Sequence, residues 1–286
     1  MPGSREMAEF RLGFAESLRV GFGKKMMVNQ AGRCEVLLET NAFRLEVAEI
    51  GRYVVYLDVA EAQDLRNRVR KLVGEPLPPS GPLLPGAPMV NVYLEENGQT
   101  LTKSFYLYTA SPTWQELRPR LSALEDRALQ ALQTGLRAEL ALSAGSVNRG
   151  GRIGVSVRLV ALGAQAISFY RPLAESDTSG GTVMLMGVRS DIPEKDLSIV
   201  DYESSELAAD QLESPLPGGA GEDKALLQLR RTTGLALRFE TALDWPPGKY
   251  DVRLNLMTNG LPPEDDQALF IRGQIMTLPV PLTITP

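Results

Sequence analysis

The sequence predicts a mainly β protein with two helices, in which an N-terminal α+β domain precedes an antiparallel β-sandwich. Up to residue 135 the hydrophobic pattern has the two-residue period of strands and switches twice to the longer period of helices. From residue 136 onward no helical period lasts longer than two turns, and short apolar runs are separated by Gly and Pro turns. We therefore place the two domains at residues 8–135 and 136–286.

The first domain opens with short β-type runs that continue to about residue 56. Residues 43–50 alternate strictly between apolar and polar side chains, and residues 33–39 do so with one slip. Residues 53–56 form a continuous apolar run. Each of these runs is typical of a strand with at least one buried face.

A helix follows these strands. Asp58 and Glu61 have the spacing of a capping box, which predicts that the helix begins after Asp58. Apolar residues then recur at helical spacing, at Ala62, Leu65, Val69 and Leu72. Gly74 is predicted to end the helix as a C-cap glycine.

Residues 74–88 contain six prolines in fifteen residues, which excludes a helix or a central strand and favours extended polyproline geometry. Because this segment separates elements of one core, we interpret it as a long loop inside the domain. Its side chains Leu77, Leu83 and Leu84 are candidate partner contacts, since apolar groups on a stiff segment suit recognition. The alternative is that these leucines fold back over the domain's own helix.

Asn97-Gly98 lies between two alternating runs and predicts a β-hairpin. A second helix is expected after it, opened by Ser111-Pro112 and by a capping box of Thr113 and Glu116. Its apolar stripe contains Trp114, Leu117, Leu121, Leu124, Ala128 and Leu132. Pro119 lies within this stripe and is expected to kink the helix or to delay its start.

The second domain is predicted to consist of strands at sandwich-like spacing. The expected strands are 138–142, 153–159, 166–170, 182–188, 225–229, 235–239, 250–256 and 276–284. The acidic segment 201–223 is expected to be a surface loop. The turn at residues 243–249 and the proline-containing run that ends the chain predict a closing hairpin with an extended edge strand.

Two runs of this domain resemble a known class of module. The run that starts at Ser143, SAGSVNRGGRIGVSVRLVALG, is similar to the opening of bacterial immunoglobulin-like modules. Together with LDWPPGKYDVRLNL, at residues 243–256, it resembles the fibronectin-III-like and intracellular proteinase-inhibitor-type sandwich. The resemblance covers residues 137–286, implies an Ig-like β-sandwich and carries over no functional residue. The N-terminal half resembles small bacterial domains of unknown function, in which strands precede a helix, a hairpin and a helix.

The overall composition excludes several classes of partner. The net charge is −5 with both signs interspersed, so no basic footprint for nucleic acid or for an anionic membrane surface is present in the sequence. No apolar run approaches the roughly 20 residues of a membrane-spanning helix. The N-terminus lacks a signal-peptide profile, so we expect a cytoplasmic protein, although a processed exported form would have the same sequence.

The chain contains no histidine and one cysteine. The absence of histidine removes Ser-His-Asp and Cys-His catalysis and the commonest nitrogen ligand for metals. A single cysteine excludes an internal disulfide. Cys34 alternates with apolar residues of its strand, so we expect a buried and inert thiol.

Four polar motifs are typical of turns or of solvent-exposed surface. Residues 177–181 are similar to the Asp-Thr-Gly of aspartic proteases, but they contain an extra residue and have no second copy. Residues 21–25 lack the spacing of a phosphate-binding loop. The acidic clusters 264–266 and Glu203, Glu206 and Asp210 lack the ligand spacing of a calcium loop. We therefore predict no metal and no cofactor.

These observations favour a non-catalytic protein that binds another protein through its sandwich and its proline-rich loop. Trp245, beside two prolines, either packs on them to close the sandwich, which the sequence favours, or is a further candidate anchor for a partner. A second hypothesis is a proteinase inhibitor, with residues 201–223 or 257–270 as the reactive loop. A third is an enzyme based on carboxylates or on a Ser-Lys pair, for which no motif has the required spacing.

Overall fold

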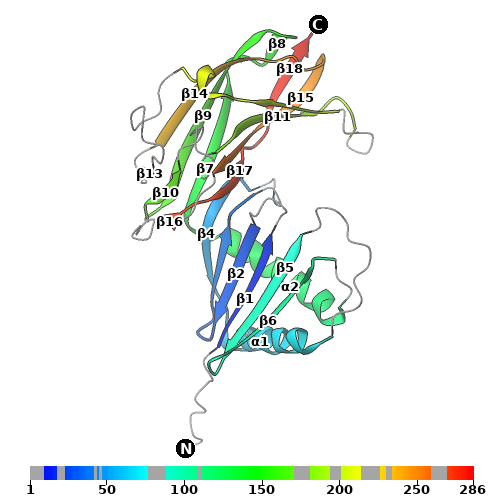
Figure 1. Ribbon diagram of the computed structural model, residues 1–286, viewed down its shortest axis with the longest axis vertical. Helices are drawn as coiled ribbons and strands as arrows, with labels where there is room; N and C mark the ends of the chain where they lie inside the picture. Colours follow the sequence, from blue (N-terminus) through cyan, green and yellow to red (C-terminus); the bar gives the residue numbers. More distant parts are fainter. Residues whose placement is uncertain are drawn as a thin grey trace, which may run out of the picture. The chain divides into compact units, whose positions relative to one another are not determined.

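The computed structural model describes residues 10–17, 23–41, 44, 47–76, 88–108, 111–170, 181–193, 201–213, 226–229, 234–258 and 269–286. Its elements are mainly β-strands with two α-helices, as the sequence predicts, and most strand pairs are antiparallel (Figure 1). By its internal contacts the chain divides into two compact units. The first unit is Met1–Leu38 with Gly51–Gln133, and the second is Glu39–Ile50 with Thr134–Pro286.

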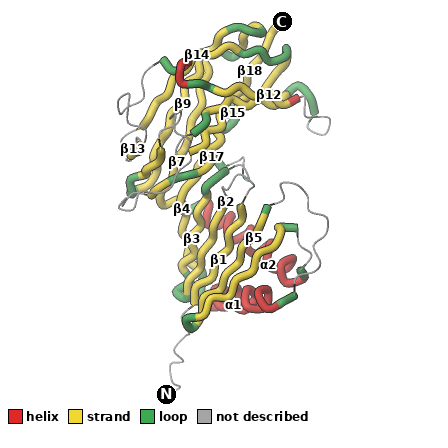
Figure 2. Tube along the Cα trace, viewed as in Figure 1, coloured by secondary structure: helices red, strands yellow, loops and turns green. Residues whose placement is uncertain are grey.

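The first unit is an antiparallel sheet with both helices packed on one face (Figure 2). Along the sheet the strand order is β4-β3-β2-β1-β5-β6. The bounds are β1 (Phe10–Ser17), β2 (Gly23–Asn29), β3 (Arg33–Leu38), β4 (Glu49–Tyr56), α1 (Val59–Gly74), β5 (Met89–Glu96), β6 (Gln99–Tyr106) and α2 (Pro112–Leu129). Alternate residues of each strand enter one apolar core with the buried stripes of α1 and α2, which fixes the face that the helices cover.

The capping residues of the two helices agree with the sequence-based expectation in part. The Asp58 carboxylate accepts a hydrogen bond from the backbone N–H of Glu61 at 2.7 Å, as predicted. Gly74 is the last residue of α1 and the cap is Glu75, in extended conformation, so the prediction of a C-cap glycine was wrong. Because the Ser111 hydroxyl accepts from the Trp114 N–H, α2 begins at Pro112 and the expected Thr113/Glu116 capping box is wrong.

Two further features of the second helix differ from the expectation. Pro119 lies inside the helix and does not delay its start. The helix ends at Leu129, so Leu132 belongs to a strand and not to the helical stripe. The hairpin prediction is confirmed, since Asn97 and Gly98 have φ values of 51° and 74° and connect β5 to β6 in register.

The second unit contains the remaining strands. They are β7 (Leu132–Leu142), β8 (Ser146–Asn148), β9 (Arg152–Gly163), β10 (Ile167–Tyr170), β11 (Val183–Arg189), β12 (Tyr202–Glu206), β13 (Leu226–Leu229), β14 (Gly234–Ala242), β15 (Gly248–Thr258), β16 (Leu269–Phe270), β17 (Gly273–Met276) and β18 (Val280–Thr285). Strands β14, β9 and β7 are neighbours in one sheet, β12-β11-β15-β18-β8 form another with β17 also on β15, and β13-β10-β16 form a third. One apolar cluster joins side chains from all three groups.

A strand was expected at 43–50, but among the described residues of 39–50 only Glu49 and Ile50 belong to a named strand. The described residues Arg44 and Val47 donate turn hydrogen bonds, and β4 begins only at Glu49. The Asn41 side chain donates to the carbonyls of Val47 and Met276 and accepts from the Met276 N–H, at 2.7–2.8 Å. These bonds attach the segment to β17, which places it in the second unit although the sequence assigned it to the first domain.

Strand β7 begins at Leu132 and contains Gly135. Two expectations for the second unit are corrected. Part of the expected loop 201–223 is strand β12, paired with β11, and residues 214–223 lie outside the described residues. The final strand is not an edge, because β18 lies between β15 and β8. Pro281 is accommodated because β8 pairs with β18 only at Thr283–Thr285, beyond the proline.

Candidate functional site

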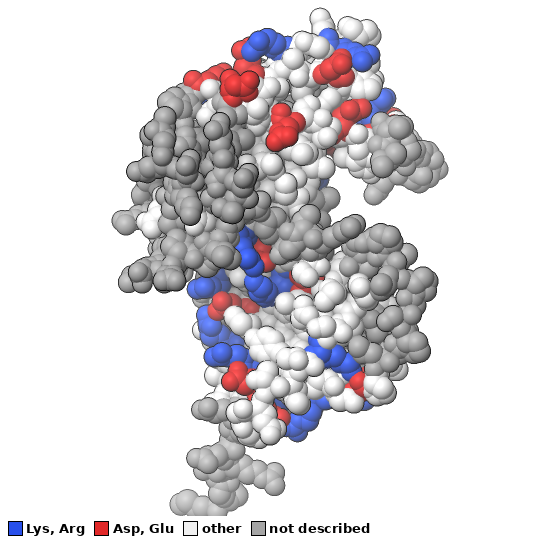
Figure 3. Space-filling view, viewed as in Figure 1, with Lys and Arg blue, Asp and Glu red and all other residues white. Residues whose placement is uncertain are grey.

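The first unit has one sheet face that neither helix covers, which we call the open face. It consists of the strand residues that alternate with the buried core residues. Two of its rows across the strands are defined by the register: Thr102, Tyr93, Gly13, Met27, Glu35 and Val54, and Ser104, Asn91, Ala15, Lys25, Leu37 and Arg52. In Figure 3 the first unit shows a mostly uncharged surface over β1 and β5, with charged residues of both signs at its borders.

Tyr93 lies across the centre of the open face. It is the cross-strand partner of Gly13, and a Cβ atom placed on Gly13 would lie 2.2 Å from the Tyr93 Cε1 atom. The ring therefore rests directly on the glycine backbone, an arrangement in which an aromatic side chain covers a strand glycine. Burial raises the pKa of the Tyr93 hydroxyl above its usual value.

The two halves of the open face differ in charge. On β3 and β4, the Glu35 carboxylate is bridged by the guanidinium groups of Arg33 and Arg52, at 2.9 and 3.1 Å. On β5 and β6 the residues of the two rows are uncharged, and the Ser104 hydroxyl donates to the Asn91 side chain at 2.6 Å. We call the residues of these two rows on β1, β5 and β6 the neutral half. The next row toward the Asn97-Gly98 turn carries Arg11 opposite Glu95.

A small cavity lies on the opposite, helix-covered side of the sheet. Its volume is about 110 Å³, and it is bounded by strand residues such as Phe14 and by Trp114 of α2. The Lys24 ammonium joins Glu125, which is buried, to Glu16, at 2.7 and 3.2 Å. This volume is well below the roughly 300 Å³ at which ligand pockets begin, so we interpret the cavity as part of the helix–sheet packing.

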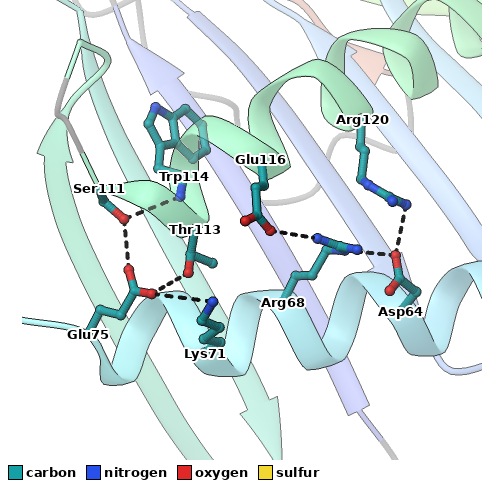
Figure 4. Close-up of polar contacts among 9 residues, drawn as sticks. All are labelled: Asp64, Arg68, Lys71, Glu75, Ser111, Thr113, Trp114, Glu116 and Arg120. Carbon is teal, nitrogen blue, oxygen red and sulfur yellow. Dashed lines mark hydrogen bonds and ion pairs between the residues drawn. The ribbon is translucent and has the colours of Figure 1, made fainter.

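Polar contacts between α1 and α2 hold the helices on their face of the sheet (Figure 4). The Glu75 carboxylate accepts hydrogen bonds from the hydroxyls of Ser111, at 2.8 Å, and of Thr113. Burial alone would raise the pKa of Glu75, but these bonds and the nearby lysines outweigh it and lower the pKa.

A second group of contacts lies further along the two helices. The Arg68 guanidinium contacts Asp64 on its own helix and Glu116 on α2, and Asp64 also pairs with Arg120. Figure 4 shows both groups between the same two helices. These contacts connect the two helices to each other, and their charges neutralise one another. We therefore assign them a structural role in holding the helices together.

The predicted partner-binding residues are distributed as follows. Leu77, Leu83 and Leu84 lie outside the described residues. Trp245 is only 3 % exposed, and its indole N–H donates to the Ser205 hydroxyl at 2.8 Å. Its ring therefore belongs to the core of the second unit, which is the alternative that the sequence left open.

The remaining motifs contribute no site among the described residues. Cys34 is fully buried, as predicted, and burial raises its pKa to about 12. No group of three or more acidic or cysteine side chains could hold a metal ion in the described part of the chain. Residues 177–180, 21–22 and 264–266 lie outside that part. No described helix is long and apolar enough to cross a membrane.

Sequence reasoning missed the open face. Its signal was the outward half of each alternating strand, and in particular a glycine and a tyrosine at outward positions. The register that brings Gly13 and Tyr93 together depends on the pairing of β1 with β5, which are far apart in the chain.

No protein-family model and no curated protein matches this chain. Among solved structures, it is similar to the Pseudomonas fluorescens alkylpurine DNA glycosylase AlkC bound to DNA, at 12 % identity and a TM-score of 0.28. That match covers 64 % of this chain and 40 % of the glycosylase chain, so the chain spans less than half of that length. AvmM, which catalyses macrocyclisation in alchivemycin A biosynthesis, has 12 % identity and a TM-score of 0.29 over 53 % of this chain and 89 % of its own.

Proposed function

We propose that this chain is a non-catalytic interaction protein whose open face binds another protein. The observation that carries the proposal is the group of three uncharged residues at the centre of that face, Met27, Gly13 and Tyr93, which the register places side by side. Met27 is 39 % exposed beside Gly13, and Tyr93 is half-buried over it. An uncharged group of side chains that includes an aromatic residue has the composition of an interface core.

The outer face of the second unit provides a contrast within the same chain. Its strands carry exposed ion pairs, including Arg152 with Glu240 at 2.9 Å and Arg158 with Glu139 at 3.5 Å. Such interspersed charges are typical of a solvated surface. The neutral half of the open face lacks them, which supports a role in protein contact.

We also propose that the second unit is an Ig-like sandwich, which would act as the adaptor module of the protein. The strand groups β7-β9-β14 and β12-β11-β15-β18 support it, since they correspond to the A-B-E and C′-C-F-G orders of that fold. The Tyr250 hydroxyl donates to the Pro246 carbonyl at 2.8 Å, as in the tyrosine corner of such domains.

The test is capture of partners from the source organism's lysate by three versions of the full chain. Met27→Arg places a charge at the centre of the open face. Ala236→Arg places the same charge at an exposed position of β14 and is the matched control. We expect a stoichiometric partner that binds wild type and Ala236→Arg and is lost with Met27→Arg, while circular dichroism shows all three folded.

Two outcomes would contradict the proposal. If Met27→Arg retains every partner of the wild type, the open face is not the contact. If the retained partner is a protease held in an inhibited complex, the proteinase-inhibitor hypothesis is favoured in its place.

A further inference from the structure

Strand β6 ends the sheet of the first unit and pairs only with β5 among the described strands. The hairpin turn Asn97-Gly98 makes Glu96 and Gln99 the first hydrogen-bonded pair. Alternate residues of β6 then direct their N–H and C=O groups away from β5. These outward residues are Thr100, Thr102, Ser104 and Tyr106, and their side chains lie on the open face.

The strands that end the other sheet paths are protected against pairing. Strand β12 carries Glu203 and Glu206. The outer edge of β14 is occupied, because the Glu213 N–H donates to the Arg238 carbonyl and Leu212 forms a bridge with Phe239. Strands β8, β13 and β16 have three, four and two residues. Short, charged or covered edges are the usual protection of sheet edges against pairing with another chain.

Strand β6 is not short, is not covered by any other described strand, and carries one charge. It is eight residues long and contains no proline. Its single charge is Lys103, whose ammonium donates to the carbonyls of Leu72, at 2.7 Å, and of Glu75 at the end of α1. The lysine is therefore directed to the helix side and held there, and the edge itself presents hydroxyl groups and backbone.

We propose that β6 pairs with β6 of a second copy of this chain, antiparallel and centred on Thr102. In this register Thr102 faces Thr102 of the second copy, and Thr100 faces its Ser104. Both are pairs of outward residues, so each exchanges two backbone hydrogen bonds. Cross-strand Thr–Thr and Thr–Ser pairs are stabilising, and a contact of one surface with itself gives a closed two-fold dimer.

The side chains on the helix side also fit this register. Leu101, which is 45 % exposed, would face the aliphatic stem of Lys103 of the second copy. A register centred on Lys103 would instead oppose two ammonium groups, which is destabilising. The dimer stands independently of the proposed function. If that function also holds, the neutral halves of the two copies become adjacent and form one larger binding surface.

The first test is the mass of the full chain in sedimentation equilibrium at 1–100 μM. We expect wild type to reach twice the chain mass of 31.2 kDa. Thr102→Pro removes one outward N–H and no bond to β5, so it should be monomeric at every concentration with unchanged circular dichroism. Thr102→Val keeps both backbone groups and the side-chain shape, and it should remain dimeric. Met27→Arg should remain dimeric too, which separates this test from that of the open face.

A second test does not depend on how well Thr102→Pro folds. Thr102→Cys places two thiols at a directly opposed pair, within the Cα separation that a disulfide requires. It should form a covalent dimer under mild oxidation at least ten times faster than the exposed control Ala236→Cys. The native Cys34 is buried and is not expected to form a disulfide.

A monomeric wild type at 100 μM, or equal cross-linking of the two cysteine variants, would overturn the proposal. So would a dimer that survives Thr102→Pro. If wild type is monomeric and Thr102→Pro loses a partner that wild type captures, the β6 edge pairs with a segment of another protein and not with a second copy.

Discussion

Trp245 shows how a single residue organises the second unit. Its ring centroid lies 5.3 Å from that of Tyr250, and it covers Gly187, where a Cβ atom would lie 2.4 Å from the indole. Its N–H is satisfied by Ser205. One side chain therefore connects β11, β12 and the turn before β15, and any larger residue at Gly187 would displace it.

We expect Trp245→Ala to lower the free energy of unfolding of the second unit by about 3–5 kcal/mol, the usual effect of removing a large buried aromatic side chain. Urea denaturation followed by circular dichroism measures the change. Leu278→Ala, at a position that is 50 % exposed, should change it by less than about 0.5 kcal/mol. A loss below about 1 kcal/mol for Trp245→Ala would show that the ring is not a core element.

Asp191, which follows β11, is expected to make the stability of the second unit depend on pH. A hydrogen bond from the Arg189 guanidinium, at 2.6 Å, lowers the pKa of Asp191 from 3.8 to about 2. Because the pKa is lower in the folded state, the stabilisation is complete above pH 4 and is lost as the pH falls through about 2. Acid titration of stability should therefore show a shallower decline between pH 4 and 2 for Asp191→Asn than for wild type. The exposed Asp244→Asn variant is the control, and a wild-type slope for Asp191→Asn would refute the assignment.

At the scale of elements, the first unit depends on the junction between the end of α1 and the beginning of α2. Ser111 is buried there and has two partners, the Trp114 N–H that it caps and the Glu75 carboxylate. The indole N–H of Trp114 donates to the carbonyl of Leu107, the residue after β6, at 2.9 Å, which links the same turn to the end of that strand. The helices are thus fixed to each other and to the edge of the sheet whose other face is open.

Ser111→Ala is expected to reduce the stability of the first unit by about 1–2 kcal/mol, because it removes an N-cap and leaves Glu75 with one hydroxyl donor fewer. The midpoint of thermal unfolding measures the loss. Ser122→Ala, exposed in the middle of the same helix, should be neutral or slightly stabilising. Equal midpoints for the two variants would mean that Ser111 does not cap the helix.

At the scale of the whole molecule, the two units are not consecutive in sequence. Residues 39–50 leave the first unit after β3, contribute to the second, and return through β4. Asn41 is one fixing point of this segment, since its side-chain amide bonds both to Val47 and to Met276. Each unit contains one of the two tryptophans, Trp114 and Trp245, so their unfolding can be followed separately.

We expect Asn41→Ala to lower the urea midpoint reported by Trp245 and to have a smaller effect on that reported by Trp114. The cause is the loss of a buried amide that satisfies backbone groups of the second unit, worth about 1–3 kcal/mol. Fluorescence of Trp114→Phe and Trp245→Phe backgrounds gives the two midpoints. A larger shift of the Trp114 midpoint would place residues 39–50 with the first unit instead.

Local chemistry was enough to predict much of this protein. Alternation, the Asp58 cap, the Asn97-Gly98 turn and the buried Cys34 each depend on a few neighbouring residues, so both helices and most strands could be placed before the structure was known. The open face, the edge position of β6, the burial of Trp245 and the assignment of residues 39–50 depend on which distant strands pair. No local pattern encodes that pairing, because the same alternating strand can have several neighbours and only packing of the complete core selects among them.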